Sequence, residues 1–148
     1  STFALYLPYQ EVPKEVAERS LSHKKNVDED KRKNILVVED IESNFAQLNI
    51  LLNKEYIISW VRNGQEAINS FIREKPDLIL MDIRMPIMDG IQATEKIRAI
   101  SLTVPIIAVT AYAFYTEQQQ AIQAGCNAVI SKPYSLERLK ETIESYIG

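Results

Sequence analysis

The strongest constraint on the fold is a fivefold alternation that begins at residue 34. Short apolar runs rich in β-forming residues alternate with segments whose apolar residues recur at helical spacing. Several of the runs are apolar at consecutive positions, which is typical of parallel strands buried on both faces. Right-handed crossovers then favour a doubly wound α/β sheet. The expected strands are 34–39 (NILVVE), 56–61 (YIISWV), 77–82 (DLILMD), 105–110 (PIIAVT) and 127–132 (NAVISK).

Five segments between and after these strands have the periodicity of covering helices. The fourth is expected over 115–124 and should end at Gly125, because glycine adopts the left-handed cap conformation without strain. Ser135 is expected to cap the fifth, which carries Leu136, Leu139 and Ile143. The first three helices each place a set of residues on one face: Phe45, Leu48, Leu51 and Leu52; Ala67, Ile68, Phe71 and Ile72; and Ile91, Thr94, Ile97 and Arg98.

Composition argues against several functional classes. The formal net charge of -3 provides no basic field for a phosphate backbone, which argues against nucleic-acid binding. The single cysteine, Cys126, cannot form an internal disulfide, and no apolar run reaches the roughly 18 residues that a membrane helix needs. We therefore expect a cytoplasmic domain that contacts no membrane. The chain begins at Ser1, which suggests a piece of a longer protein.

Polar residues stand at four of the five expected strand ends. Glu39 and Asp40 close the first strand, Asp82 the third, Thr110 the fourth and Lys132 the fifth. In doubly wound sheets, ligands bind beyond these carboxyl ends. Three carboxylates meeting there would repel one another unless a cation lay among them, and an all-oxygen ligand set suits Mg²⁺. A hydroxyl and an ammonium opposite them would suit an anion bound across the metal, most simply a phosphoryl group.

Each of these residues alone has a simpler interpretation. An acidic residue after a strand more often caps a helix than binds a metal, a threonine can merely end a strand, and a lysine is usually a solvated charge. Their joint placement at equivalent ends of strands one, three, four and five favours a site, because scattered capping residues would rarely coincide in this way.

Four segments in order, ILVVED, DLILMDIRMPIMDG, PIIAVTA and VISKP, resemble the motifs of the response-regulator receiver domain. The resemblance covers residues 34–148. It implies a flavodoxin-like (βα)5 sheet with strand order 2-1-3-4-5.

The resemblance also implies a phosphoacceptor and a metal site. Asp82 would take a phosphoryl group from a phosphohistidine of a histidine kinase, in the same parent chain or in another protein. Glu39, Asp40 and Asp82 would hold Mg²⁺ together with the backbone carbonyl of Arg84. On this basis the domain would catalyse its own aspartyl phosphorylation and dephosphorylation and would change conformation to signal.

Further residues receive roles from the same resemblance. Lys132 would pair with Asp82 before transfer and with the phosphoryl group afterwards, and the bond between Lys132 and Pro133 is cis in the family. The Thr110 hydroxyl would move toward the phosphoryl group. Backbone N–H groups near Arg84 and Ala111 would complete the anion cradle.

Two features bear on switching and on the lifetime of the phosphorylated state. Family members often carry an aromatic switch residue three positions before the lysine, where this chain has Val129. Coupling through an aromatic flip at that position is therefore not expected. Arg84 and Tyr112 stand two residues after Asp82 and Thr110, and we expect these bulky side chains to slow hydrolysis of the aspartyl phosphate.

The first 33 residues have a different character. Residues 1–9 alternate apolar side chains as a strand does and resemble the final strand of a histidine-kinase ATP-binding domain, and residues 10–33 are a charged linker that contains the solvated His23. The chain would thus be the C-terminal receiver of a hybrid sensor histidine kinase, whose parent chain can be membrane-anchored. The severed strand would pack on another copy, giving a possible dimer, or would be disordered.

Three other functions are weighed against this one. A phosphohydrolase of the haloacid-dehalogenase kind also uses an aspartate nucleophile and Mg²⁺, but it needs a second aspartate at position 84, which is arginine. A flavodoxin-like binding module needs a phosphate-cradling loop after the first strand, and none is present there. A pseudo-receiver that only binds partners would not need the full set of acidic, threonine and lysine residues. The last helix reaches Gly148, so we expect output through a separate histidine phosphotransfer protein or through the parent kinase.

Overall fold

The computed structural model describes residues 31–111 and 114–148 of the chain. The predicted strand over residues 1–9, most of the linker with His23, and Tyr112 lie outside the described residues.

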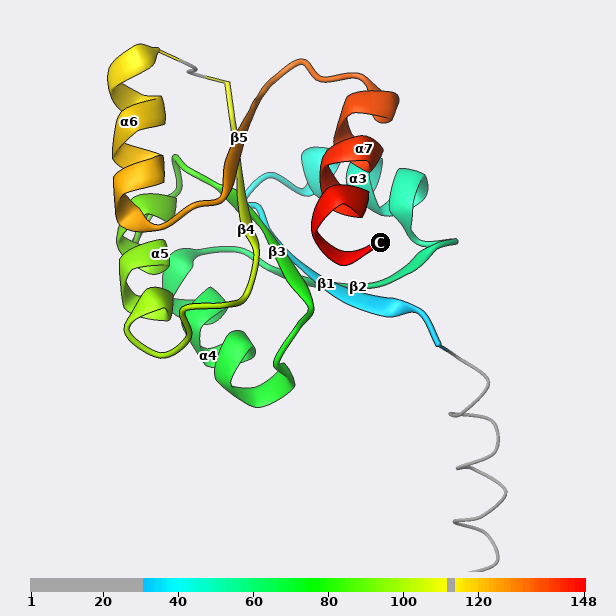
Figure 1. Ribbon diagram of the computed structural model, residues 1–148, viewed down its shortest axis with the longest axis horizontal. Coiled ribbons are helices and arrows are strands. Elements are labelled where there is room, and N and C mark those ends of the chain that lie inside the picture. Colours follow the sequence, from blue (N-terminus) through cyan, green and yellow to red (C-terminus); the bar gives the residue numbers. More distant parts are fainter. Residues whose placement is uncertain (1–30, 112–113) are drawn as a thin grey trace, which may run out of the picture. The chain divides into compact units, whose positions relative to one another are not determined.

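The described chain alternates strands and helices, labelled here as in Figure 1. Five strands, each parallel to its neighbours, form one sheet in the order β2-β1-β3-β4-β5. The predicted doubly wound, flavodoxin-like sheet is therefore confirmed. In chain order the elements are β1 (Lys33–Val38), α3 (Glu42–Leu52), β2 (Tyr56–Val61), α4 (Gly64–Glu74), β3 (Leu78–Asp82), α5 (Gly90–Arg98), β4 (Ile106–Thr110), α6 (Tyr115–Ala124), β5 (Ala128–Ser131) and α7 (Leu136–Ile147).

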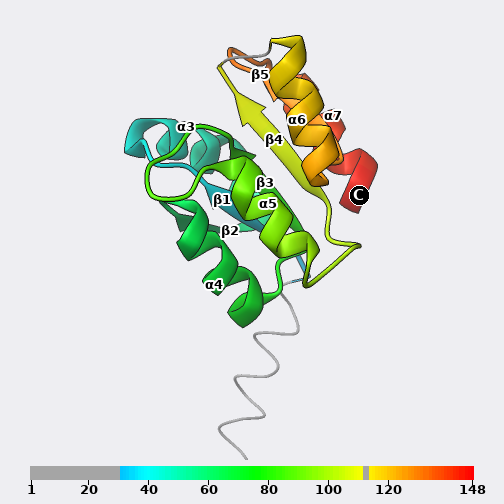
Figure 2. The ribbon, with the colours of Figure 1, turned by 90° about the vertical axis from the view of Figure 1, so that its left-hand side faces the viewer.

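Helices cover both faces of the sheet. Helices α3 and α7 pack on one face, and α4, α5 and α6 pack on the other, as Figures 1 and 2 show from two directions. Successive strand residues alternate between the two cores, so Leu36 and Ile79 face α4 and α5 while Ile35 and Leu80 face α3 and α7. This double burial explains why the strands are apolar at consecutive positions. Each buried Leu or Ile contributes about 1.5–3 kcal/mol through removal of its side chain from water.

The predicted strand bounds agree with the structure to within one residue at each end. The helical faces agree less completely, because Ile72 in α4 is 54% exposed. Ile72 lines an open depression of about 510 Å³, together with Ile100 and Pro105, at the end of the sheet where β3 and β4 begin. Ile72 therefore follows the helical period of the buried face of α4 without being buried itself.

Local capping chemistry fixes where several helices begin. The side chains of Asn63, Asp89 and Ser135 each accept a hydrogen bond from the backbone N–H three residues later, at the starts of α4, α5 and α7. Each such cap contributes about 1 kcal/mol, because it satisfies a donor that the helix leaves unpaired. The expected Ser135 cap is thereby confirmed. Helix α6 ends at Gly125, whose φ of 120° is one that side chains rarely adopt.

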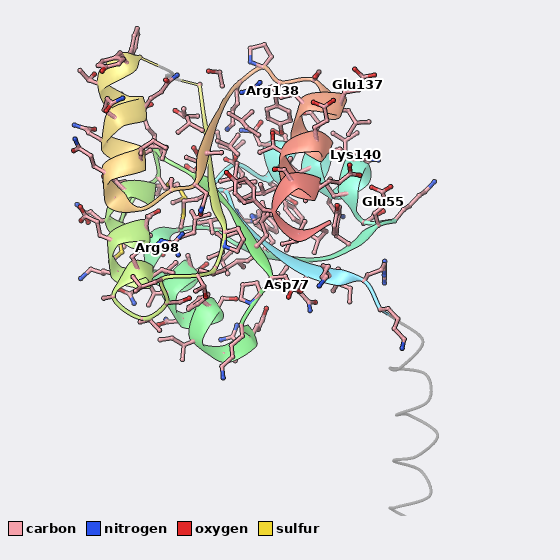
Figure 3. The ribbon with its side chains drawn as sticks, in the orientation of Figure 1. Glu55, Asp77, Arg98, Glu137, Arg138 and Lys140 are labelled. Atoms are coloured by element: carbon pink, nitrogen blue, oxygen red, sulfur yellow. The ribbon has the colours of Figure 1, made fainter. Side chains whose placement is uncertain are left out.

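Polar contacts tie distant segments together away from the strand carboxyl ends. Arg98, labelled in Figure 3, donates to the carbonyl of Gly125 at 3.0 Å, to that of Ser101 at 3.1 Å and to Oδ1 of Asn127 at 2.9 Å. These bonds hold the end of α5 against the turn between α6 and β5.

Helix α7 is also tied to the turn between α3 and β2. Lys140 in α7 lies 3.2 Å from Glu55 in that turn, and Figure 3 shows the two side chains side by side. Both are partly exposed, so the pair contributes little stability. Within the described ranges, no helix is long and apolar enough to cross a membrane.

Candidate functional site

Three carboxylates meet where β1 and β3 end. Val38 is the last residue of β1 and pairs with Met81 of β3, so Glu39 and Asp40 emerge beside Asp82, the last residue of β3. One carboxylate oxygen from each of the three residues lies within 4.8 Å of the other two. The parallel register thus brings together the acidic residues that the sequence placed at strand ends.

Asp82 is buried, with 8% of the residue exposed. Burial, and after it the nearby Glu39 carboxylate, raise the pKa of this carboxyl, while the charge of Lys132 and a hydrogen bond from the Arg84 backbone N–H lower it; the net result is a rise from 3.8 to about 7. A cation among the carboxylates would favour the ionised form of Asp82 and so oppose this rise.

Asp40 carries an unsatisfied oxygen. Its Oδ1 is buried and has no hydrogen-bond partner among residues 31–111 and 114–148. A buried carboxylate oxygen left unpaired is costly, so such an atom calls for an explanation such as an ion or a water molecule. The donor set is all oxygen and carries excess negative charge, which fits a hard divalent cation such as Mg²⁺.

Helix capping does not explain these acidic residues. The N-cap position of α3 is Ile41, and it makes no side-chain capping bond. Glu39 does accept a hydrogen bond from the Ile41 backbone N–H at 3.2 Å, and the Asn44 amide lies 3.5 Å from the same Oε2 atom. The simpler interpretation thus accounts for one oxygen of Glu39 and leaves Asp40 and Asp82 unexplained.

Lys132 points into the acidic group from the end of β5. Its Nζ lies 3.2 Å from Oε1 of Glu39, and the Glu39 side chain is only 3% exposed. The ion pair that the structure shows is thus with Glu39, whereas we expected the lysine to pair with Asp82. The Lys132 N–H donates to the Thr110 carbonyl at 2.7 Å, and the peptide bond between Lys132 and Pro133 is cis, as the family resemblance implied.

Thr110 ends β4 and is buried at 2% exposure. Its hydroxyl donates to Oε1 of Glu117, in the first turn of α6, at 2.8 Å. The Arg84 Nε donates to the other oxygen of the same carboxylate at 3.1 Å. Glu117 was not expected from the sequence, where an acidic residue near a helix start reads only as a partner of the helix dipole.

The loop between Asp82 and α5 is held by close backbone contacts. The Gly90 N–H donates to the Ile83 carbonyl at 2.8 Å, and a Cβ added at Gly90 would lie 2.2 Å from the Asp82 carbonyl oxygen. Met85 and Met88 are partly buried and pack on the core beneath α4 and α5. Ile87 has a φ of 70° and is 82% exposed, an unusual conformation for a β-branched residue.

An aromatic cluster supports the acidic loop from the side of β2. The Trp60 Nε1 donates to the Glu39 carbonyl at 2.8 Å, and its ring stacks on Phe45 with centroids 4.2 Å apart. The guanidinium carbon of Arg62 lies 4.2 Å from the Trp60 ring centroid. Trp60 is the only tryptophan of the chain, so its fluorescence should report on this loop.

Two of the remaining predicted residues lie beside Lys132. Ala111 and Pro133 line a cavity of about 420 Å³ beside Lys132, bounded on its other side by α3. Val129, at the position where an aromatic switch residue often stands, is half-buried in β5 and packs on the core beneath α4 to α6.

Comparison with known proteins gives a consistent result. Residues 35–144 match the family model described as the response regulator receiver domain. The polar-differentiation response regulator DivK of Brucella anthropi is 40% identical over 119 residues, which cover 78% of this chain and 97% of that protein. Its counterpart in Brucella ovis is 40% identical over 123 residues, with the same shares covered.

Solved structures agree. The receiver domain of the sensor histidine kinase PA1611 of Pseudomonas aeruginosa, described with a magnesium ion coordinated in its active-site cleft, is 37% identical with a TM-score of 0.75. The match covers 79% of this chain and 98% of that one. A CheY-like receiver domain of Methanospirillum hungatei is 28% identical with a TM-score of 0.74, over 78% of this chain and 93% of its own.

Proposed function

The chain belongs to the response regulator receiver domain family of two-component systems, and we propose that Asp82 accepts a phosphoryl group from a phosphohistidine in the presence of Mg²⁺. The observation that carries this proposal is the convergence of Glu39, Asp40 and Asp82 within 4.8 Å, with a lysine beside them. The phosphorylated domain would then change conformation and pass on the signal.

The residues present fit a magnesium ion. Glu39, Asp40 and Asp82 would hold it, with the Arg84 carbonyl as a further ligand. The unpaired Oδ1 of Asp40 supports the fit, because a cation would satisfy that oxygen. Bound Mg²⁺ would offset charge on the phosphoryl oxygens and on the attacking carboxylate.

Asp82 would act as the nucleophile. One of its carboxylate oxygens forms a bond to phosphorus while the bond between phosphorus and the donor imidazole nitrogen breaks, and the imidazole leaves with that electron pair. This oxygen must be ionised, so the raised pKa of Asp82 opposes the reaction until cationic charge reaches the site. Lys132, 3.2 Å from Glu39, is placed to supply part of that charge and to contact a phosphoryl oxygen after transfer.

Thr110 would report the phosphoryl group to the rest of the fold. Its hydroxyl stands at the end of β4, next to β3, which carries Asp82. Because Val129 replaces the aromatic residue often found in the family, the change would pass through Thr110 and α6 and not through a ring flip.

We place this domain in a hybrid sensor histidine kinase in the cytoplasm. The likeness of residues 1–9 to the end of a kinase ATP-binding domain supports this, and so does the similarity to the receiver domain of the sensor kinase PA1611. Receiver domains interact with histidine kinases or phosphotransfer proteins, and one of these would be the partner. Dimerisation through residues 1–9 stays a prediction, because these residues lie outside the part of the chain that the structure describes.

The phosphohydrolase and pseudo-receiver alternatives are less well supported. Position 84 carries an arginine whose side chain pairs with Glu117, where a phosphohydrolase would need its acid–base aspartate. A pseudo-receiver would have no use for three buried or half-buried carboxylates beside a lysine.

Incubation with acetyl phosphate and Mg²⁺, read by intact mass, tests the proposal. Wild type should gain one phosphoryl group, and Asp82→Asn should gain none. Asp89→Asn is the matched control, because Asp89 lies in the same loop and asparagine caps α5 equally well. Equal labelling of wild type and Asp82→Asn, or no labelling of wild type where other receivers label, would contradict the proposal.

A further inference from the structure

Glu117 joins three parts of the molecule around the site. Its carboxylate accepts from Thr110 at the end of β4 and from Arg84 in the loop after β3, and Glu117 itself lies in the first turn of α6. The side chain is 11% exposed, so the charge depends on these donors. The amino-terminal end of α6 favours the negative charge as well.

The Thr110 hydroxyl has a single proton, so it can donate to only one acceptor at a time. At 2.8 Å from Oε1 of Glu117 that proton is committed to the carboxylate. A hydroxyl cannot donate the same proton to a phosphoryl oxygen as well. Binding of Thr110 to Glu117 and binding of Thr110 to a phosphorylated Asp82 are therefore mutually exclusive.

We propose that Glu117 is a latch that holds Thr110 in the unphosphorylated arrangement and so sets how readily the domain switches. This inference rests on the proposed function of Asp82 and Thr110. Formation of the aspartyl phosphate draws the Thr110 proton away from Glu117, and the cost of that exchange lowers the population of the active arrangement. Glu117 is a positioning residue, since it acts through Thr110.

Arg84 gives the latch a second function. Because Nε of Arg84 holds the other oxygen of Glu117 at 3.1 Å, the carboxylate keeps one partner when Thr110 leaves. The buried Glu117 carboxylate then still has a cationic hydrogen-bond donor, which limits the free-energy cost of the phosphorylated arrangement. The loop after Asp82 and the start of α6 thus remain joined in both arrangements.

The latch makes a graded prediction for two substitutions. Glu117→Gln keeps a neutral acceptor of the same shape, which binds the hydroxyl about half as strongly as the carboxylate does. Glu117→Met keeps the volume and removes the acceptor. Apparent affinity for beryllofluoride, a phosphoryl mimic, should rise on the order of tenfold in Glu117→Met and by a smaller factor in Glu117→Gln, because the unswitched state loses a charge-assisted bond.

Beryllofluoride titration in saturating Mg²⁺, followed by Trp60 fluorescence and amide chemical shifts, measures this affinity. Glu137→Gln is the control, because Glu137 is an exposed acidic residue in the first turn of α7, labelled in Figure 3. That change removes the same charge from a helix start and should leave the affinity unaltered. Affinity for Mg²⁺ alone should stay within about twofold in both Glu117 variants, as expected for a residue that is not a ligand.

The same Glu117 substitutions in a Thr110→Val protein distinguish the latch from a general effect of removing a negative charge. In Thr110→Val the hydroxyl is absent, so Glu117→Gln and Glu117→Met should no longer raise beryllofluoride affinity. An increase that persists in the valine background, or no increase in the threonine background, overturns the latch while leaving the phosphoacceptor role of Asp82 intact. Failure of wild type both to bind beryllofluoride with Mg²⁺ and to be labelled overturns the proposed function and the latch with it.

Discussion

Replacing Asp82 by asparagine should stabilise the metal-free protein at alkaline pH. Burial and the neighbouring Glu39 carboxylate raise the pKa of Asp82 from 3.8 to about 7 in the folded state. Between these values the folded chain holds a proton that the unfolded chain has released, so the free energy of unfolding falls as pH rises from about 4 to about 7. Above pH 7 the free energy of unfolding has lost the whole of this contribution, and below pH 4 it has lost none of it.

The size of the effect follows from the same pKa. One pH unit corresponds to 1.36 kcal/mol, so the full rise in pKa sets a ceiling of ~4 kcal/mol. Relaxation of the site and entry of water reduce this ceiling, and we expect Asp82→Asn to gain about 2 kcal/mol at pH 8. At pH 4 the two proteins should differ little, because Asp82 is protonated in the folded state and pH 4 lies close to its pKa of 3.8 in the unfolded chain. Mg²⁺ should recover part of the difference by stabilising wild type.

Urea denaturation at pH 4, 6 and 8 without metal, followed by circular dichroism and Trp60 fluorescence, measures the difference. Asp89→Asn should change the free energy of unfolding by less than about 0.5 kcal/mol at each pH, because the α5 cap is retained. A gain in Asp82→Asn that is the same at pH 4 and pH 8, or no gain at pH 8, would refute the account of Asp82 as a carboxyl buried against like charge.

Three further predictions concern the stability of the fold and the lifetime of the phosphoryl group. Gly90→Ala should lower the free energy of unfolding by at least ~2 kcal/mol, because the new Cβ would lie 2.2 Å from the Asp82 carbonyl oxygen; stability in urea unchanged from wild type would contradict that contact. Arg98→Ala should lower the free energy of unfolding by about 2–3 kcal/mol in thermal denaturation, because three hydrogen bonds to the guanidinium are lost; a loss under 0.5 kcal/mol would show that water replaces the guanidinium. Arg84→Ala should speed loss of the phosphoryl group from Asp82, measured by intact mass over time, because a bulky side chain beside the site is removed; slower loss would count against this shielding role.

Much of the fold was predictable because one physical pattern repeats. Strands buried on both faces are apolar at consecutive positions, and this placed every strand end to within one residue. The convergence of Glu39, Asp40 and Asp82 followed from parallel register, since residues at equivalent strand ends must meet at one edge. The sequence could therefore indicate which residues meet before any contact was known.

The side-chain pairing within the site was less predictable. Lys132 pairs with Glu39 and not with Asp82. Several carboxylate oxygens of similar charge lie within reach of this ammonium, and the side-chain rotamers, which the sequence does not reveal, determine which of them it contacts. Glu117 lies seven residues beyond Thr110 across a loop, so neither helical spacing nor strand register brings the two together in advance. Ile72 satisfied the helical period yet stayed exposed, because burial depends on what lies opposite the helix and not on the helix alone.

Transfer from a phosphohistidine to Asp82 tests the central claim most directly. A phosphorylated histidine phosphotransfer protein, freed of nucleotide, is mixed with the chain and Mg²⁺, and the product is reduced with borohydride, which converts an aspartyl phosphate to homoserine. Peptide mass spectrometry should find homoserine at position 82 and unchanged aspartate at positions 40, 77 and 89, with no conversion when Mg²⁺ is chelated. Homoserine at another aspartate, or undiminished conversion at position 82 without Mg²⁺, would contradict the account.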